Sequence, residues 1–170
     1  MIKLDYFDFR ISHFMQSERC ATILHKAEKI CLRRGVRFTP LRSLVLGLIA
    51  KQSGAISAYQ LLDILQTQSA NAKPPTVYRA LEFLLIQGFI HKIESTNSYI
   101  LCHHISTADH NCALFICDSC RRVVEYIVPE IERALMSMAQ RDHFYTEHSI
   151  IETHGRCQRC HDIATITDGL

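Results

Sequence analysis

The sequence predicts an α+β protein made of two modules. Apolar residues recur at helical spacing through the first half, which then ends in one short hairpin. β-branched residues alternate in the second half, around turns that contain paired cysteines. We expect an N-terminal extension over residues 1–17, a helical module with a hairpin over 18–102, and a small α/β module over 111–165.

The composition is that of a globular protein, and its charge is unevenly divided. Hydrophobic residues make up 48% of the 170 residues and charged residues 21%. No apolar run approaches a membrane span of ~18 residues, and no signal peptide is recognisable, so we expect a cytoplasmic protein without membrane contact. Through Lys92 there are 13 Lys and Arg against 6 Asp and Glu, a net +7; from Ile93 onward there are 6 against 11, a net −5. A basic half favours a polyanionic partner, with a chance asymmetry on solvated faces as the alternative.

Residues 1–17 show no clear period, and the first predicted helix runs from Ser17 to near Gly35. Its apolar face consists of Cys20, Leu24, Ala27 and Cys31. Cysteines on such a face are more often small core residues than ligands. We therefore expect Cys20 and Cys31 in the core.

Two further helix starts follow. Thr39 and Pro40 form an N-cap followed by proline at the first helical position, and Ser57 caps the next helix. The residues expected to face inward are Leu41, Leu44, Val45 and Leu48 in the first of these helices and Leu61, Leu62 and Leu65 in the second. Polar residues 66–73 then form a turn.

The stretch PPTVYRALEFLLIQG predicts a fourth helix that Gly88 ends. Its inward face consists of Val77, Ala80, Leu81, Leu84 and Leu85. Thr76, Tyr78 and Arg79 are left exposed on its early turns. Helices, a turn, a helix and a hairpin in this order predict a winged helix-turn-helix, whose exposed turns would contact double-stranded DNA. A small helical domain with an exposed Arg is the alternative, and the basic charge favours DNA.

The second half predicts strands that flank one helix. Residues 113–128 are two strands around a turn, 129–142 are a helix, and 144–157 are a strand. A three-stranded sheet of this size has little core of its own. We expect metal and pairing with a second copy to stabilise it, which makes this module a dimerisation domain and the protein a homodimer.

Two C-x2-C pairs are the strongest chemical signal in the chain. They are Cys117 with Cys120, and Cys157 with Cys160. Four thiolates suit the tetrahedral preference of zinc at ~2.3 Å per bond, and they leave no open position for water, so the site is structural and not catalytic. Two disulfides or a redox C-x-x-C are the alternatives.

A second set of possible metal ligands lies on the hairpin and in the residues that follow it. If Thr96 and Asn97 form its turn, His91 lies directly opposite Cys102, close enough to share one metal ion. His110 in the following loop and Glu125 on the next predicted strands would complete four ligands. The alternative is a small buried cysteine and a solvated glutamate.

Several stretches resemble the ferric-uptake-regulator family, and more narrowly its zinc-sensing branch. They are TPLRSLVLGLI, ISAYQLLDILQ, KPPTVYRALEFLLIQGFIHKIESTNSYILC and FICDSC with the late C-x2-C, and they cover about Cys20 to Cys160. The resemblance implies a dimeric winged-helix repressor. It implies structural zinc on Cys117, Cys120, Cys157 and Cys160, regulatory zinc on His91, Cys102, His110 and Glu125, and DNA contacts at Tyr78, Arg79 and Tyr59.

The resemblance therefore implies two zinc ions per chain and a repressor that binds operator DNA when zinc-loaded and controls zinc uptake genes. A regulator of the same family that responds to iron, manganese or peroxide is the alternative. The iron-sensing branch has an HHDH-type motif where this chain has TADHNCALFIC, with only His110 left. Other histidines that could bind metal are His103, His104, His148 and His154. An enzyme would need an open metal position beside a general base, which the sequence does not show; a zinc-storing adaptor would not bind DNA.

Overall fold

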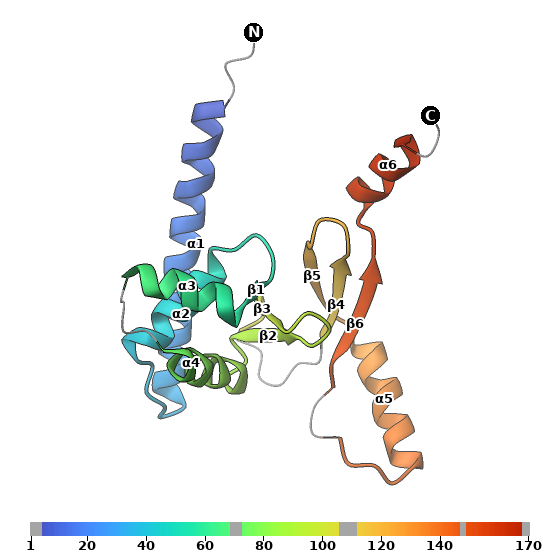
Figure 1. Cartoon of the computed structure of the whole chain (residues 1–170). Helices are drawn as coiled ribbons and strands as arrows, with labels where there is room; N and C mark the ends of the chain where they lie inside the picture. The colour runs from blue at the N-terminus through green and yellow to red at the C-terminus, as the bar shows by residue number, and fades with distance from the viewer. Residues whose placement is uncertain (1–4, 69–72, 106–111, 147–148, 168–170) are drawn as a thin grey trace. The chain divides into compact units, whose positions relative to one another are not determined.

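The computed structural model describes residues 5–68, 73–105, 112–146 and 149–167, and side chains over 18–67, 73–105, 112–146 and 149–163. Helices and strands both occur, which confirms the α+β fold class (Figure 1). The chain divides into two compact units, Met1–Ser106 and Thr107–Leu170. Among the described residues, no helix is both long and apolar enough to cross a membrane.

Helix α1 spans Asp5–Arg33 and begins well before the predicted start at Ser17. Residues 5–17 show no apolar period, so the pattern of the sequence could not reveal that the helix continues there. Adding residues to an existing helix requires no new nucleation, because each one adds a backbone hydrogen bond. Cys20 and Cys31 are buried, which confirms their prediction as core residues.

Helix α2 spans Pro40–Ala50 and begins as predicted. The side chain of Thr39 accepts a hydrogen bond from the backbone N–H of Arg42, and Pro40 is the first helical residue. The predicted inward face is wrong in part, because Leu44 is exposed whereas Leu46 and Ile49 are buried. Several helices and the hairpin surround α2, so its buried surface is wider than one amphipathic stripe.

Helix α3 spans Ala58–Gln68 and follows a short strand, β1 (Ile56–Ser57), that the sequence did not predict. The hydroxyl of Ser57 accepts from the backbone N–H of Gln60 at 3.2 Å, and the Gln60 side chain accepts from the Ser57 N–H at 2.9 Å. This reciprocal capping box fixes the start of the helix. Leu61 and Leu65 are buried, as predicted.

Helix α4 spans Pro74–Ile86, and its predicted inward face is confirmed by the burial of Val77, Ala80, Leu81 and Leu84. The helix ends in a Schellman motif. Gly88 has φ +68°, its N–H donates to the carbonyl of Leu85, and the Phe89 N–H donates to the carbonyl of Leu84. Glycine suits this position because a side chain disfavours positive φ.

The hairpin consists of β2 (Ile90–Ile93) and β3 (Ser98–Leu101), in a sheet of order β1-β3-β2. Its loop comprises residues 94–97 instead of the predicted two-residue turn, because Ile93 pairs with Ser98. Asn97 has φ +47° and closes this loop. Helices α1 to α4 and this hairpin pack around one core, which confirms the winged helix-turn-helix.

The second unit is built on a sheet of order β5-β4-β6, in which β4 is antiparallel to β5 and parallel to β6. Its elements are β4 (Cys112–Cys117), β5 (Val123–Ile127), α5 (Pro129–Arg141), β6 (Ile151–Gly155) and α6 (Gln158–Thr167). The strand predicted from Phe144 begins only at Ile151. Helix α6 was not predicted.

Candidate metal centres and nucleic-acid interface

The two cysteine pairs meet at one end of the second unit. Cys117 ends β4, and the N–H of Arg121 donates to the carbonyl of Cys117 at 2.8 Å, which closes the turn that contains Cys120. We name Cys117–Cys120 the first knuckle. Cys157 and Cys160, the second knuckle, lie where β6 passes into α6. The Sγ atoms of the four cysteines all lie within 4.8 Å of one another.

The spacing of the sulfurs fits a tetrahedral zinc site. Zn–S bonds of about 2.3 Å at tetrahedral angles place neighbouring sulfurs about 3.8 Å apart. The sulfurs of Cys120 and Cys157 lie 3.7 Å apart, well beyond a disulfide bond, and all four cysteines are free. In the described structure the four cysteines therefore form no disulfide bonds.

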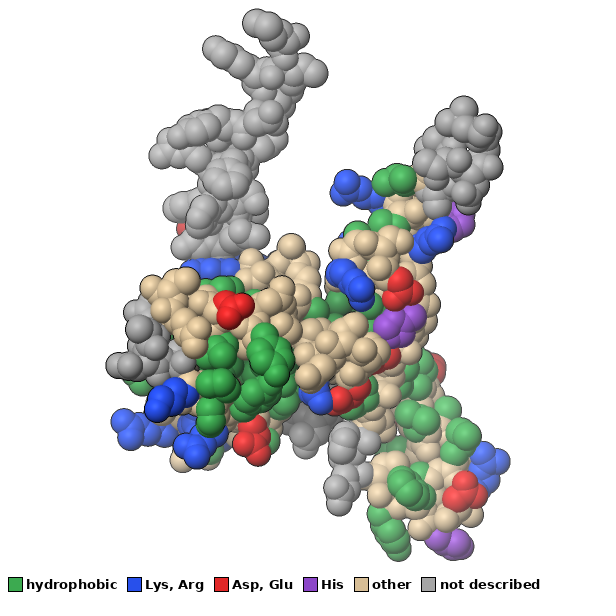
Figure 2. Space-filling view, viewed as in Figure 1, with side chains coloured by type: hydrophobic (Ala, Val, Ile, Leu, Met, Phe, Trp, Pro, Cys, Tyr) green, Lys and Arg blue, Asp and Glu red, His purple; other side chains and the backbone are tan. Residues whose placement is uncertain are grey.

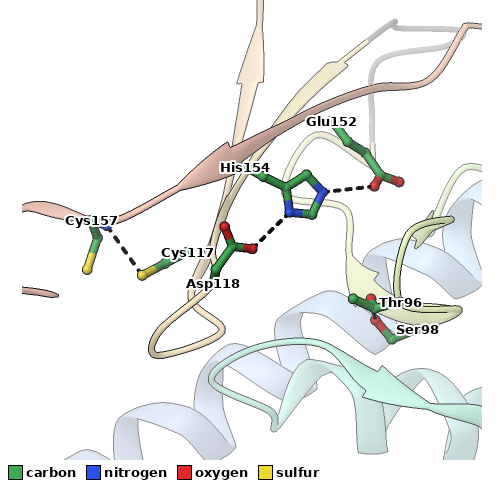
Figure 3. A network of polar contacts seen from close by, with 7 residues as sticks. All are labelled: Thr96, Ser98, Cys117, Asp118, Glu152, His154 and Cys157. Carbon is green, nitrogen blue, oxygen red and sulfur yellow. Dashed lines mark hydrogen bonds and ion pairs between the residues drawn. The ribbon is translucent and has the colours of Figure 1, made fainter.

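Backbone donors favour the thiolate form of Cys117. The Cys157 N–H donates to Sγ of Cys117 at 3.3 Å (Figure 3). This bond and one from the Cys120 backbone lower the pKa of Cys117 to about 6. Side-chain contacts with Cys120 and Cys157 raise the pKa of Cys160 to about 12. Four thiols this close cannot all ionise without a cation, and a bound zinc dication would supply the compensating charge.

The second candidate set begins at the base of the hairpin. The register predicted from a two-residue turn is wrong: His91 pairs with Ile100, and the Cys102 N–H donates to the carbonyl of Phe89. Even so, a ring nitrogen of His91 and Sγ of Cys102 lie within 4.8 Å of one another. Cys102 is buried and His91 is half-buried. The sulfur is therefore shielded from solvent, whereas the imidazole remains partly accessible to a metal ion.

The other two predicted ligands belong to the second unit. Glu125 lies on β5 opposite Leu114 and is half-buried. His110 lies outside the described residues, as does His148. His103 has a partner in α1, because its Nδ1 lies 3.1 Å from a guanidinium nitrogen of Arg19.

The residues predicted to contact DNA all lie exposed on α3 and α4. Thr76, Tyr78 and Arg79 occupy the first turns of α4 and point away from its buried face. Tyr78 is 41% exposed, and Tyr59, in the first turn of α3, is 69% exposed. Side chains this exposed are available to contact a DNA backbone or the base edges in a groove. Lys and Arg side chains gather over part of the first unit in Figure 2 (blue, lower left), as a polyanion-binding surface requires.

Sequence reasoning missed a polar network beside the cysteines. Nδ1 of His154 lies 3.0 Å from a carboxylate oxygen of Asp118, and its Nε2 lies 3.5 Å from one of Glu152 (Figure 3). Asp118 belongs to the first knuckle, whereas the other two residues lie on β6. Only the parallel pairing of β4 with β6 brings them together, and no local pattern indicates that pairing.

The chain is similar to proteins of known role along most of its length. Residues 33–154 match the model of the ferric uptake regulator family. The zinc uptake regulation protein of Escherichia coli (strain K12) is 49% identical over 149 residues, which cover 88% of this chain and 87% of that relative.

Two solved structures resemble this one closely. A zinc uptake regulator complexed with zinc and DNA has a TM-score of 0.83 at 49% identity, over 86% of this chain and 97% of that chain. The crystal structure of holo XcZur has a TM-score of 0.78 at 38% identity, over 83% of this chain and 98% of that chain.

Proposed function

The chain belongs to the ferric uptake regulator family, and from this premise we propose that it is a zinc-responsive transcriptional repressor, not an enzyme. Zinc-loaded protein binds operator DNA as a dimer and controls zinc uptake genes. A DNA-binding regulator works where the DNA is, so we place it in the cytoplasm. The observation that carries the proposal is the His91–Cys102 pair at the base of a hairpin in a DNA-binding fold.

The proposed sensor site consists of His91, Cys102, His110 and Glu125. One thiolate, two imidazoles and one carboxylate suit zinc, although other divalent ions accept the same set. His91 and Cys102 belong to the first unit and Glu125 to the second. Zinc held by both units restricts the orientations available to the winged helices of a dimer to those that match the spacing of the operator half-sites. A thousandfold gain in DNA affinity requires about 4 kcal/mol of coupling.

The proposed structural zinc is held by Cys117, Cys120, Cys157 and Cys160. The sulfur spacing and the N–H donor at Cys117 support this assignment. All four ligand positions are thiolates, so no position is left for a substrate or a reactive water. When bound, the metal links the turn after β4 to the start of α6. The proposed stoichiometry is therefore two zinc ions per chain.

The proposed DNA-binding surface consists of the first turns of α3 and α4. The Arg79 guanidinium can bind guanine through two parallel hydrogen bonds. Thr76 and the hydroxyl groups of Tyr59 and Tyr78 can contact phosphate or sugar. The four side chains are exposed. The opposite face of α4 is buried in the core. That division leaves the DNA-facing side chains free of a role in the core.

The proposed homodimer forms through the second unit. In that unit, large apolar side chains are unusually exposed. Those on α5 are visible in Figure 2 (green, lower right), and Met136 and Met138 there are each more than half exposed. Phe115 and Tyr126 form an exposed edge-to-face pair at 5.1 Å, beside a hollow of about 400 Å³ on the sheet. A second copy of the chain would cover such surface.

Zinc content and DNA binding, measured on the same preparation, test the proposal. We expect about two zinc ions per chain in the full-length protein, in line with two four-ligand sites. A mild chelator should remove the sensor zinc and release operator DNA in a gel-shift titration, and added zinc should restore binding.

The other function classes give different results. A zinc-storing adaptor would bind zinc but not DNA. A regulator of another metal would regain DNA binding with iron or manganese and not with zinc at equal free concentration. Either result would overturn the proposal.

A further inference from the structure

The imidazole of His154 lies between two carboxylates, with one ring nitrogen directed to each (Figure 3). Nδ1 contacts Asp118 at 3.0 Å and Nε2 contacts Glu152 at 3.5 Å. The two contacts fix the plane of the ring. Asp118 lies within the first knuckle, directly after Cys117, and His154 lies three residues before Cys157. The His154–Asp118 contact therefore joins the first knuckle to β6, three residues before the second knuckle begins.

Backbone contacts reinforce the same junction. Cys117 pairs with Gly155 at the end of the parallel β4–β6 ladder. The Asp118 N–H donates to the carbonyl of Gly155 at 2.8 Å, and the Cys157 N–H donates to Sγ of Cys117. Asp118 is thus held to β6 twice, by its backbone and by its carboxylate. The carboxylate contact is the one that a substitution can remove without altering a zinc ligand.

Loss of zinc from a closed four-thiolate site requires one knuckle to move away from the other. Because the site has no open position, a chelator can bind the metal only after such a movement. A contact that holds the first knuckle to β6, the strand that leads into the second knuckle, opposes this movement although it involves no zinc ligand. Groups that hydrogen-bond directly to metal ligands commonly change metal affinity by about 10- to 100-fold, and a contact that touches no ligand should have a smaller effect.

We propose that His154 is a positioning residue of the four-cysteine zinc site, which holds the first knuckle against β6 through Asp118 and slows the loss of zinc. This inference rests on the proposed structural zinc. Glu152 supports it by fixing the ring from the other side. The side chains of His154 and Asp118 are 38% and 56% exposed, so solvent weakens their attraction.

Zinc-release kinetics on the full-length protein test the inference. The variants are His154→Ala, Asp118→Asn and the double variant, with release to a chromogenic chelator in excess as the readout. Glu130→Gln is the matched control, because it breaks an exposed 2.9 Å ion pair of the same unit within α5 alone. Circular dichroism of each variant, recorded through the same time course, shows whether release precedes unfolding.

We expect each single variant to lose the zinc of the four-cysteine site about three- to tenfold faster than the wild type, with the fold retained. The effect should be no larger, because the ion pair is partly exposed to solvent. The double variant should be no faster than the faster single variant, because both substitutions act on the same charged contact between His154 and Asp118. With cobalt in place of zinc, the thiolate-to-cobalt absorption should keep its shape in every variant, since the ligands are unchanged, while its decay on adding chelator accelerates.

Three results would overturn the inference. They are release at the wild-type rate from both single variants, additive effects in the double variant, and equal acceleration by Glu130→Gln. If His154→Ala does not fold, Asp118→Asn still decides, because it is nearly isosteric and changes an exposed side chain. A folded wild type without zinc on its cysteines would instead overturn the structural-zinc assignment itself, and this inference with it.

Discussion

Cys102 lies two residues beyond Ile100, the residue on β3 that pairs with His91. His91 and Cys102 are therefore diagonal neighbours across the hairpin and not direct opposites. Because side chains alternate with a period of two along a strand, both still point to the same face. The diagonal placement keeps the nitrogen and the sulfur within 4.8 Å, a separation that one metal ion can bridge.

Cys102→Ser tests whether Cys102 is a ligand of the proposed sensor site. The substitution is nearly isosteric, and we expect a fold that is at most about 1–3 kcal/mol less stable, the cost of a buried hydroxyl. Zinc-dependent operator affinity should fall by up to about a thousandfold. Cys31→Ser is the control, since that cysteine is equally buried in the same unit but is no proposed ligand. Zinc-dependent repression by Cys102→Ser at the wild-type level would remove Cys102 from the sensor.

Cys117→Ser tests the structural zinc. Removing one of four thiolates from a closed site should destabilise the second unit by more than about 4 kcal/mol, as loss of a metal typically does. The measurements are zinc content and urea unfolding. Cys112→Ser is a suitable comparison, because Cys112 is another buried cysteine of β4. A folded Cys117→Ser dimer that lacks zinc would contradict the assignment.

Arg79→Ala tests the DNA-binding surface. We expect a loss of about 1–3 kcal/mol in operator affinity, the range for one bidentate contact with a base, and no change in zinc content. Lys26→Ala is the charge-matched control, on an exposed position of α1. Gel shifts with specific and unrelated DNA separate the two roles that an arginine can have. An equal loss on both sequences would assign Arg79 to phosphate and not to a base.

Ser57→Ala tests how the start of α3 presents Tyr59. The substitution removes both side-chain hydrogen bonds of Ser57 and should lower the free energy of unfolding by about 0.5–2 kcal/mol. Tyr59 lies in the turn that would fray, so operator affinity should fall modestly. Ser57→Asp keeps an N-cap acceptor and should retain stability. Equal stability of wild type and Ser57→Ala would show that the cap is not used in solution.

The His154 contacts predict a pH-dependent part of stability. The hydrogen bond that the imidazole donates to the Asp118 carboxylate is the main cause that raises the pKa of His154, and Glu152 adds to it. A raised pKa in the folded state means that the contribution is complete below the unfolded value of about 6.5 and is lost as pH rises through the folded pKa. The melting temperature of wild type minus that of His154→Gln should therefore decrease from pH 6 to pH 9. Arg122 and Arg156, which line the same hollow, are unchanged in both proteins. A difference that grows with pH would contradict the assignment.

Much of the first unit could be predicted because its signals are local. Thr39 with Pro40, Ser57 with Gln60, and Gly88 each mark a helix end through a hydrogen bond within a few residues. The hairpin register could not be predicted in the same way. A four-residue loop closed by Asn97 and a two-residue turn both suit the sequence there, and the two choices differ only in which residues pair.

In the second unit, the cysteine spacing predicts a set of metal ligands but not what surrounds them. The contact between Asp118 and His154 depends on the parallel ladder of β4 and β6, whose partners lie far apart in sequence. Helix α6 could not be predicted because its first turn overlaps the second knuckle. The C-x2-C spacing there is also typical of a turn that binds metal. Non-local pairing and overlapping signals set the limit in both cases.

Helix α4 contributes four residues to the core and exposes Thr76, Tyr78 and Arg79, yet none of the proposed zinc ligands lies on it. With the proposed assignments, recognition of an operator and the threshold for zinc would be encoded by separate side chains. New exposed residues on α4 would redirect the protein to a different promoter while its metal response is preserved. Exchange of that helix surface alone offers a route to a family of zinc biosensors that share one calibration and drive different reporters.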